Sequence, residues 1–177
     1  MLLTDQIKML IRDVPDFPKP GIIFKDLTPL LEKPAVVRQV VVAMADHHSR
    51  QRIDAIGAIE ARGFLFGFLL AQELAVPFIP VRKEGKLPYK KLRQEYALEY
   101  GHASIEMHED AIVPGWKVLV HDDLLATGGT ADATGRLIAR LGGEVAGFSF
   151  LLNLSFLGGE DLLRGKYKRD LHYLIKY

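Results

Sequence analysis

The sequence predicts an α/β protein in which helices cover a central parallel sheet on both faces. Short apolar segments of strand length recur along the chain, and segments of helix length separate them. Strands that alternate with helices in this way form parallel sheets, which are buried on both faces. No internal repeat and no linker interrupts the alternation, so we expect the 177 residues to form a single domain, 1–177.

The N-terminal part of the chain is expected to contain two helices separated by a loop. Apolar residues from Leu3 to Val14 recur at helical spacing. Two prolines and a glycine in 16–21 (DFPKPG) end this helix, because they cannot continue it. Pro34 suits the first position of a second, amphipathic helix.

From residue 53 onward, strands and helices are expected to alternate. The expected strands are 53–59, 77–81, 117–121 and 144–152, and the expected helices are 63–74 and 130–141. Residues 96–100 and 102–106 are expected to form the arms of a hairpin around Gly101. The polar and basic segment 82–93 contains a glycine and a proline, so we expect it to be an exposed loop.

The composition excludes several classes of protein. Hydrophobic residues make up 49% and charged residues 25%, as in soluble globular proteins, and the formal net charge of +1 gives no basic excess for nucleic acid. The absence of cysteine excludes disulfides, thiolate zinc sites and a cysteine nucleophile. The N-terminus lacks a secretory pattern, and the apolar run 64–71 is far shorter than the roughly 20 residues that span a bilayer. We expect a cytoplasmic protein with neither a membrane nor a nucleic acid as partner.

The segment 118–130 (VLVHDDLLATGGT) carries the clearest chemistry, because an apolar strand leads through two acids and a glycine-rich turn into a helix. Such a turn lies at the carboxyl end of its strand, where ligands bind in open α/β sheets. Its backbone N–H groups can surround a phosphate. The residues expected to do so are Ala126, Thr127, Gly128, Gly129 and Thr130. An ordinary Gly-Gly turn is the alternative, but the whole ordered string disfavours it.

Asp122 and Asp123 need a partner other than the phosphate, which would repel them. Hydroxyl groups or a hydrated cation satisfy this need. A phosphate, vicinal hydroxyls and a divalent ion together describe a ribose 5-phosphate. The two commoner nucleotide-binding motifs are missing from the sequence. The candidate Walker loop, GKLP at Gly85, lacks the required Ser or Thr, and no G-x-G-x-x-G pattern follows a strand.

Basic residues elsewhere suit an anionic leaving group. Arg62 falls between an expected strand and an expected helix, where its planar guanidinium could bind a pyrophosphate through two hydrogen bonds. The cations of 82–93 could form a lid that closes over such an anion. A surface arginine and a solvated run of charges are the alternatives. The histidines indicate little. His47 and His48 are expected to be solvated, His102 and His108 lack a metal-ligand pattern, and His121 stands where an apolar residue is expected.

The segment HDDLLATGGT resembles the phosphoribosyl pyrophosphate (PRPP) signature of the type I phosphoribosyltransferases, and its DDLLATGGT form resembles the adenine-specific members in particular. The likeness covers nearly the whole chain. Four further blocks resemble the family in the same order: 16–31 (DFPKPGIIFKDLTPLL), 60–67 (EARGFLFG), 82–88 (RKEGKLP) and 98–101 (LEYG).

The resemblance implies a base-binding hood over 1–34, a flexible loop over 82–94 and a cis peptide bond between Glu60 and Ala61. It also assigns roles to individual residues. Asp122 and Asp123 would hold the ribose hydroxyls, and Glu99 would be the acid/base residue. The pyrophosphate would be bound by Arg62, Arg82, Lys83 and Lys86, and adenine by Ile23, Phe24, Lys25 and Leu124. For Phe24 and Glu99 the alternatives are a core aromatic residue and an outward-facing strand carboxylate.

The implied reaction is adenine plus PRPP giving AMP and pyrophosphate in purine salvage, with Mg²⁺ bound mainly through substrate and water. The family also implies a homodimer with shared active sites, in which Arg82 reaches the neighbouring subunit. The helix 63–74 is apolar nearly all round, which favours burial on more than one side. Another purine or pyrimidine phosphoribosyltransferase, or a PRPP- or nucleotide-sensing regulator on the same fold, is the alternative.

Overall fold

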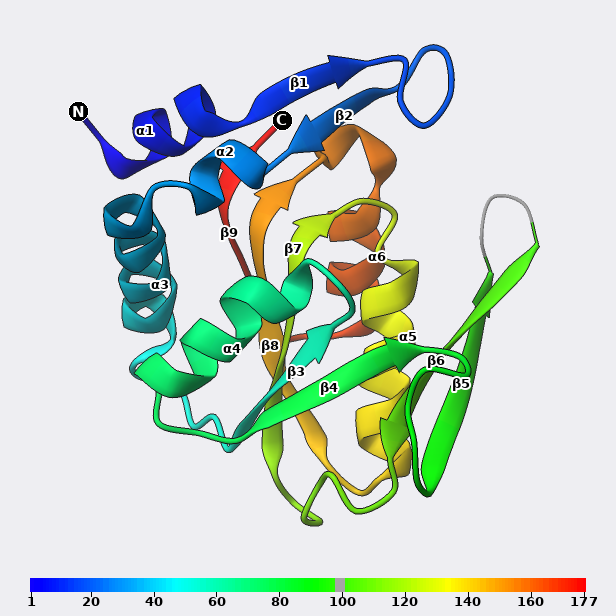
Figure 1. Cartoon of the computed structure of the whole chain (residues 1–177). Coiled ribbons are helices and arrows are strands. Elements are labelled where there is room, and N and C mark those ends of the chain that lie inside the picture. The colour runs from blue at the N-terminus through cyan, green and yellow to red at the C-terminus, as the bar shows by residue number, and fades with distance from the viewer. Residues whose placement is uncertain (98–100) are drawn as a thin grey trace. The chain divides into compact units, whose positions relative to one another are not determined.

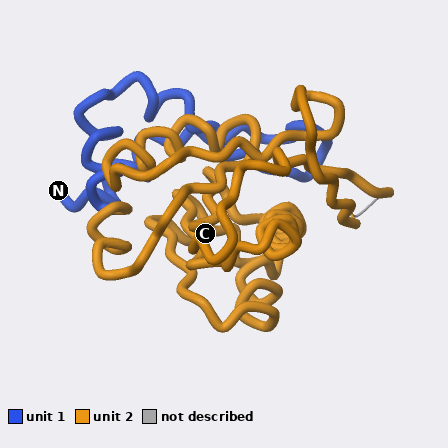
Figure 2. Tube along the Cα trace, turned by 90° about the horizontal axis from the view of Figure 1, so that it is seen from below, with its two compact units in different colours: residues 1–43 blue, residues 44–177 orange. Residues whose placement is uncertain are grey.

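The computed structural model describes residues 1–97 and 101–177, and it divides the chain into two compact units, Met1–Ala43 and Met44–Tyr177. Figure 2 colours the two units separately. Helix α3 (Pro34–His48) contains the boundary between them. Within the described residues no helix has both the length and the apolar character to span a bilayer.

The first unit is built around a two-stranded antiparallel sheet. Its elements are α1 (Leu3–Leu10), β1 (Arg12–Pro15), β2 (Ile23–Asp26) and α2 (Thr28–Leu31), followed by the start of α3. Val14 pairs with Phe24 across the two strands, and the turn between them is closed by the Gly21 N–H donating to Asp16 Oδ1 at 2.8 Å. The expected first helix therefore ends at Leu10 rather than at Val14, because the chain after Ile11 pairs with β2 instead of continuing the helix.

The second unit contains a seven-stranded sheet in the order β5-β6-β4-β3-β7-β8-β9 (Figure 1). Its strands are β3 (Ala55–Ile59), β4 (Phe78–Lys83), β5 (Lys91–Ala97), β6 (His102–His108), β7 (Lys117–Leu125), β8 (Glu144–Asn153) and β9 (Asp170–Lys176). Five neighbouring strands run parallel: β4, β3, β7, β8 and β9. Strands β5 and β6 add an antiparallel hairpin at one edge. The predicted α/β class with a largely parallel sheet is confirmed.

Helices cover both faces of this sheet. On one face lies α4 (Gly63–Glu73), whose Gly67 approaches Ala58 and His121 so closely that a Cβ there would lie 3.1 Å from the imidazole. On the other face, Val120 belongs to a core cluster with Leu137 of α5 (Gly129–Arg140). Consecutive residues of a strand face opposite ways, so His121 and Val120 mark the two sides. The chain also contains η1 (Ser155–Leu157) and α6 (Gly159–Lys166).

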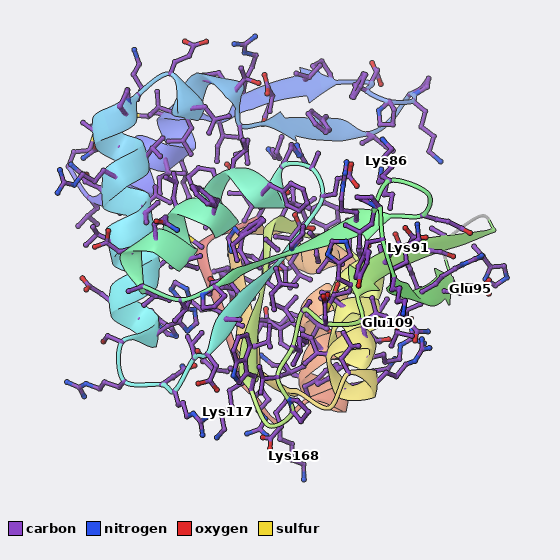
Figure 3. All side chains as sticks on the ribbon, turned by 60° about the horizontal axis from the view of Figure 1, so that its bottom comes forward. Lys86, Lys91, Glu95, Glu109, Lys117 and Lys168 are labelled. Atoms are coloured by element: carbon purple, nitrogen blue, oxygen red, sulfur yellow. The ribbon has the colours of Figure 1, made fainter. Side chains whose placement is uncertain are left out.

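The expected loop over 82–93 is shorter than the sequence predicted. Arg82 and Lys83 belong to β4, and residues 91–93 belong to β5, which leaves 84–90 as the connection. Figure 3 labels one residue from each part: Lys86 lies in the connection, and Lys91 is the first residue of β5. Strand β5 forms because 91–97 pairs along its length with 102–108. Charged residues are tolerated there because β5 is the edge strand.

Candidate active site

The glycine-rich turn connects the carboxyl end of β7 to the first residue of α5. Gly128 has a φ of 80°, a left-handed conformation that glycine adopts without a steric penalty, and α5 begins at Gly129. A pocket of about 220 Å³ lies at this turn. It is lined by Arg62, Asp122, Asp123, Leu124, Leu125, Ala126, Thr127, Gly128, Gly129, Thr130, Ala131 and Phe150. The structure thus brings the expected phosphate-binding residues, the two acids and Arg62 together around one cavity.

The turn is supported by Gly159, which the sequence did not single out. The Gly159 N–H donates to the Ala126 carbonyl oxygen at 3.1 Å. A Cβ at position 159 would collide with that oxygen and would lie 2.9 Å from the Gly128 nitrogen. Only glycine permits this close backbone approach. The adjacent glycines at 158 and 159 were the signal in the sequence, but their role depends on a contact with a turn some 30 residues earlier.

The two acids of the pocket lie next to one another, Asp123 buried and Asp122 partly buried. The Asp123 N–H donates to Asp122 Oδ1 at 2.8 Å, and Arg62 Nε lies 2.9 Å from Asp123 Oδ2. Burial, followed by the neighbouring Asp123 charge, raises the pKa of Asp122 well above its usual value. Burial also raises the pKa of Asp123, although the Arg62 guanidinium opposes this shift. Since one guanidinium faces two carboxyl groups, the site suits hydroxyl donors or an added cation.

Glu60 holds part of the expected pyrophosphate-binding set in place. Its carboxylate accepts hydrogen bonds from Arg82 Nε at 3.3 Å, from Arg82 Nη2 at 3.1 Å and from the Lys83 N–H at 3.0 Å. Lys86 Nζ is 3.9 Å away. Burial alone would raise the pKa of Glu60, but the hydrogen bonds from Arg82 and the Lys83 N–H lower it below its usual value. The sequence did not reveal this role, because Glu60 and Arg82 are 22 residues apart.

A second cavity, of about 90 Å³, adjoins the first. Glu60, Lys83, Asp122 and Thr130 are among the residues that line it, and Asp122 and Thr130 also line the larger pocket. The Glu60–Ala61 peptide bond is cis, as the family resemblance implied. The carboxyl ends of β3, β4 and β7 therefore contribute an acid, a cation and the glycine-rich turn to neighbouring cavities.

The residues expected to bind the base fall in different units. Ile23, Phe24 and Lys25 belong to β2 of the first unit, where the Phe24 ring packs edge-on against Phe17 at 5.2 Å. Leu124 lies on β7 and lines the larger pocket of the second unit. Their joint role in binding adenine stays a prediction. Glu99 falls outside the described residues, and its role also stays a prediction.

One histidine is more buried than the sequence predicted, and another is buried at a position where an apolar residue was expected. His48 was expected to be solvated, but it is only 1% exposed, because it follows Met44 and Ala45 at helical spacing on the buried side of α3. His121, at the expected apolar position, is fully buried. Burial, and then the nearby His48, lowers the pKa of His121 to about 3, so its imidazole is neutral at pH 7.

The burial of His121 predicts a loss of stability in acid. Its folded-state pKa of about 3 lies below the unfolded value of 6.5, so the unfolded chain takes up the proton first. The stabilisation is fully present above pH 6.5 and is lost as the pH falls toward 3. One such group contributes up to about 1.4 kcal/mol per pH unit. Urea unfolding at pH 7.5, 6.0 and 5.0 should give a shallower decline for His121→Leu than for wild type. Equal slopes would contradict this explanation, and His102→Leu, at an exposed position, is the control.

Comparison with known proteins agrees with this geometry. Residues 26–160 match the family model of the phosphoribosyl transferase domain, the class that the fold and the glycine-rich turn indicate. The adenine phosphoribosyltransferase of Cytophaga hutchinsonii is 50% identical over 99% of this chain and 97% of its own length. The chain belongs to the type I phosphoribosyltransferases, in the adenine phosphoribosyltransferase family.

Solved structures give the same result. The adenine phosphoribosyltransferase of Thermoanaerobacter pseudethanolicus has a TM-score of 0.94 and 48% identity, with 98% of this chain and 99% of that one covered. The Saccharomyces cerevisiae enzyme, solved with adenine and an imino-altritol bisphosphate, has a TM-score of 0.88 and 35% identity, with 97% and 98% covered.

Proposed function

We infer that this chain transfers the phosphoribosyl group of PRPP to adenine, giving AMP and pyrophosphate, in purine salvage. The observation that carries the inference is the larger pocket, where the phosphate turn, two adjacent carboxyl groups and an arginine meet at the carboxyl end of β7. The family supplies the base, because the relatives named above are adenine phosphoribosyltransferases.

The reaction proposed is a displacement at the anomeric carbon of PRPP. Adenine N9 forms the new bond to that carbon as the bond to the pyrophosphate oxygen breaks, and the N9 proton leaves. Positive charge develops on the ribose ring, and the leaving pyrophosphate takes the electron pair. The protein's task is therefore to place negative charge beside the ring and positive charge around the leaving group.

The second unit offers groups for both tasks. The backbone of the turn 126–130 would hold the 5-phosphate at the N-terminus of α5. Asp122 and Asp123 would accept hydrogen bonds from the ribose hydroxyls and stabilise the developing positive charge. Arg62, Arg82, Lys83 and Lys86 would bind the leaving pyrophosphate.

Mg²⁺ is part of the proposal, because it would neutralise charge on the pyrophosphate. Carboxylate oxygens are ligands that Mg²⁺ accepts, and Asp122 and Asp123 supply them at the pocket. The raised pKa values of this pair fit a site that gains a cation together with its substrate. We propose that Mg²⁺ is held mainly through substrate and water.

We propose that the base is recognised by stacking and by main-chain groups. Phe24 would stack on the adenine ring opposite Leu124, and the backbone of Ile23 and Lys25 would read its edge. Glu99 would manage the proton on adenine during the displacement. These assignments rest on the family resemblance of the two motifs that contain the residues.

We also propose a homodimer with shared active sites. The outer side of α4 exposes three large apolar residues, Leu65 (47%), Phe68 (51%) and Leu69 (40%). Contiguous exposed apolar surface on a helix is typical of an interface. In this dimer Arg82 would serve the pyrophosphate site of the partner subunit.

The proposed base specificity predicts a clear preference. Adenine should be converted at least tenfold better than hypoxanthine or guanine, because main-chain groups that pair with an exocyclic amino group reject an oxo group; tenfold corresponds to about 1.4 kcal/mol in transition-state binding. The measurement is pyrophosphate release from PRPP and Mg²⁺ with each free base. Better turnover of an oxopurine would show another purine phosphoribosyltransferase, and no turnover with any base would favour a sensor of PRPP.

A further inference from the structure

A group of histidines and an aspartate lies where the end of α3 meets the start of β9, entirely within the second unit. His47 Nε2 is 2.8 Å from Asp170 Oδ2, and His48 Nδ1 is 3.8 Å from the same oxygen. One ligand atom from each of the three residues falls within 4.8 Å of the others. His47 and Asp170 are partly exposed and His48 is buried, so the group opens to solvent on one side.

The surrounding side chains hold these groups in position. Gln51 Nε2 donates to Asp170 Oδ2 at 3.0 Å. The His172 ring stacks on the His47 ring, with centroids 3.8 Å apart and planes 16° from parallel. Such neighbours orient ligands in metal sites, because a fixed ring and a fixed carboxylate need little reorganisation on binding.

Several buried polar atoms without a hydrogen bond lie in or beside the same group. Neither ring nitrogen of His48 makes a well-formed hydrogen bond within the described part of the chain, and the same is true of Gln51 Oε1 and His172 Nδ1. Buried polar atoms are normally satisfied, so a cluster of exceptions calls for an unseen partner. A cation would accept the lone pair of an unprotonated imidazole nitrogen of His48, which no N–H donor among the described residues satisfies.

We propose that His47, His48 and Asp170 form a binding site for a transition-metal ion such as Zn²⁺. Two imidazoles and a carboxylate are a donor set that Zn²⁺ accepts, with a fourth position left for water. Atoms bonded to one ion at about 2.0–2.2 Å lie roughly 3–4 Å apart. The 3.8 Å separation of His48 and Asp170 already fits this range, and the 2.8 Å contact between His47 and Asp170 has to open slightly. Mg²⁺ is a poor fit, because it prefers oxygen ligands.

The proposed metal site is separate from the nucleotide pocket. Asp170 pairs with Gly147 toward the amino end of β8, whereas the phosphate turn follows Leu125, which pairs with Asn153 at the carboxyl end of that strand. The metal would join the last turn of α3 to β9.

The test is a calorimetric titration of the metal-free protein with ZnCl₂ at pH 7.5, without nucleotide and with millimolar Mg²⁺ present. The Mg²⁺ occupies oxygen-rich sites and leaves the imidazole site open. We expect one Zn²⁺ per chain and at least a tenfold loss of affinity in His47→Ala and in Asp170→Ala. His102→Ala is the matched control, because His102 is exposed and lies on β6, toward the other edge of the sheet.

Two further measurements keep the proposal falsifiable if Asp170→Ala unfolds. Zn²⁺ should shift the ring ¹⁵N resonances of His47 and His48, and it should raise the unfolding temperature of wild type but not of the milder variant His47→Gln. The proposal is overturned if wild type binds no Zn²⁺, or if binding survives His47→Ala and is lost in Asp123→Asn. AMP synthesis should be unchanged in His47→Ala, which separates this site from the proposed reaction.

Discussion

An Arg62→Ala variant is expected to lose about 10²–10³-fold in kcat/KM for PRPP, the scale for removal of one group that stabilises transition-state charge. Arg62 lies 2.9 Å from Asp123 and lines the larger pocket, so it faces both the acid pair and the proposed position of the pyrophosphate. Its loss removes a bidentate donor for the leaving group. It also leaves the carboxyl groups of Asp122 and Asp123 without their arginine, which should raise their pKa values further.

Arg62→Lys is the informative control. Lysine keeps the positive charge but lacks the planar fork, so we expect activity between those of wild type and Arg62→Ala. Steady-state pyrophosphate release gives the rates, and circular dichroism checks that both variants are folded. If Arg62→Ala stays within threefold of wild type, Arg62 serves only to pair with Asp123.

Mixing two inactive variants is expected to restore activity if the dimer shares its sites. Arg82→Ala removes the group proposed to reach the partner, and the double variant Asp122→Asn/Asp123→Asn removes the proposed ribose contacts within its own chain. Each mixed dimer then has one site with all three residues intact. With random exchange of subunits, half of the dimers are mixed and half of their sites work, so activity should return to about a quarter of wild type.

The control is a mixture in which one chain carries the Arg82 and the aspartate substitutions together. A chain that carries Arg82→Ala together with the double aspartate change, mixed with an inactive Arg62→Ala chain, leaves no intact site and should give no recovery. Light scattering gives the oligomeric state at the assay concentration. A monomer would end the dimer proposal, whereas a dimer without recovery would confine Arg82 to its own subunit, where it already pairs with Glu60.

The phosphate turn was predictable because its parts are contiguous. A strand, two acids, two glycines and a helix start follow one another in 118–130, and local geometry alone places the backbone N–H groups beside the acids. The parallel sheet was predictable for a similar reason, since each buried strand carries its own apolar signal. Strands β3, β7 and β8 lie close to where their apolar runs predicted them.

The hairpin at the sheet edge was only partly predictable. Residues 91–97 carry many charges, and composition favoured a loop over the first of them. Residues 91–97 form a strand because they pair with 102–108, and an edge strand exposes one side and can keep its charges in water. Strand β9 and the two-stranded sheet of the first unit were likewise decided by pairing rather than by local pattern.

By itself, the sequence determined the α/β class, the glycine-rich turn with its acid pair and, through its motifs, the family. Only the tertiary structure decided which distant residues support them: Glu60 against Arg82, Gly159 beneath the turn, and His48 beside Asp170. The physical reason is that a turn is specified by consecutive dihedral angles, whereas a salt bridge, a close backbone approach or a buried imidazole depends on segments that only folding brings together.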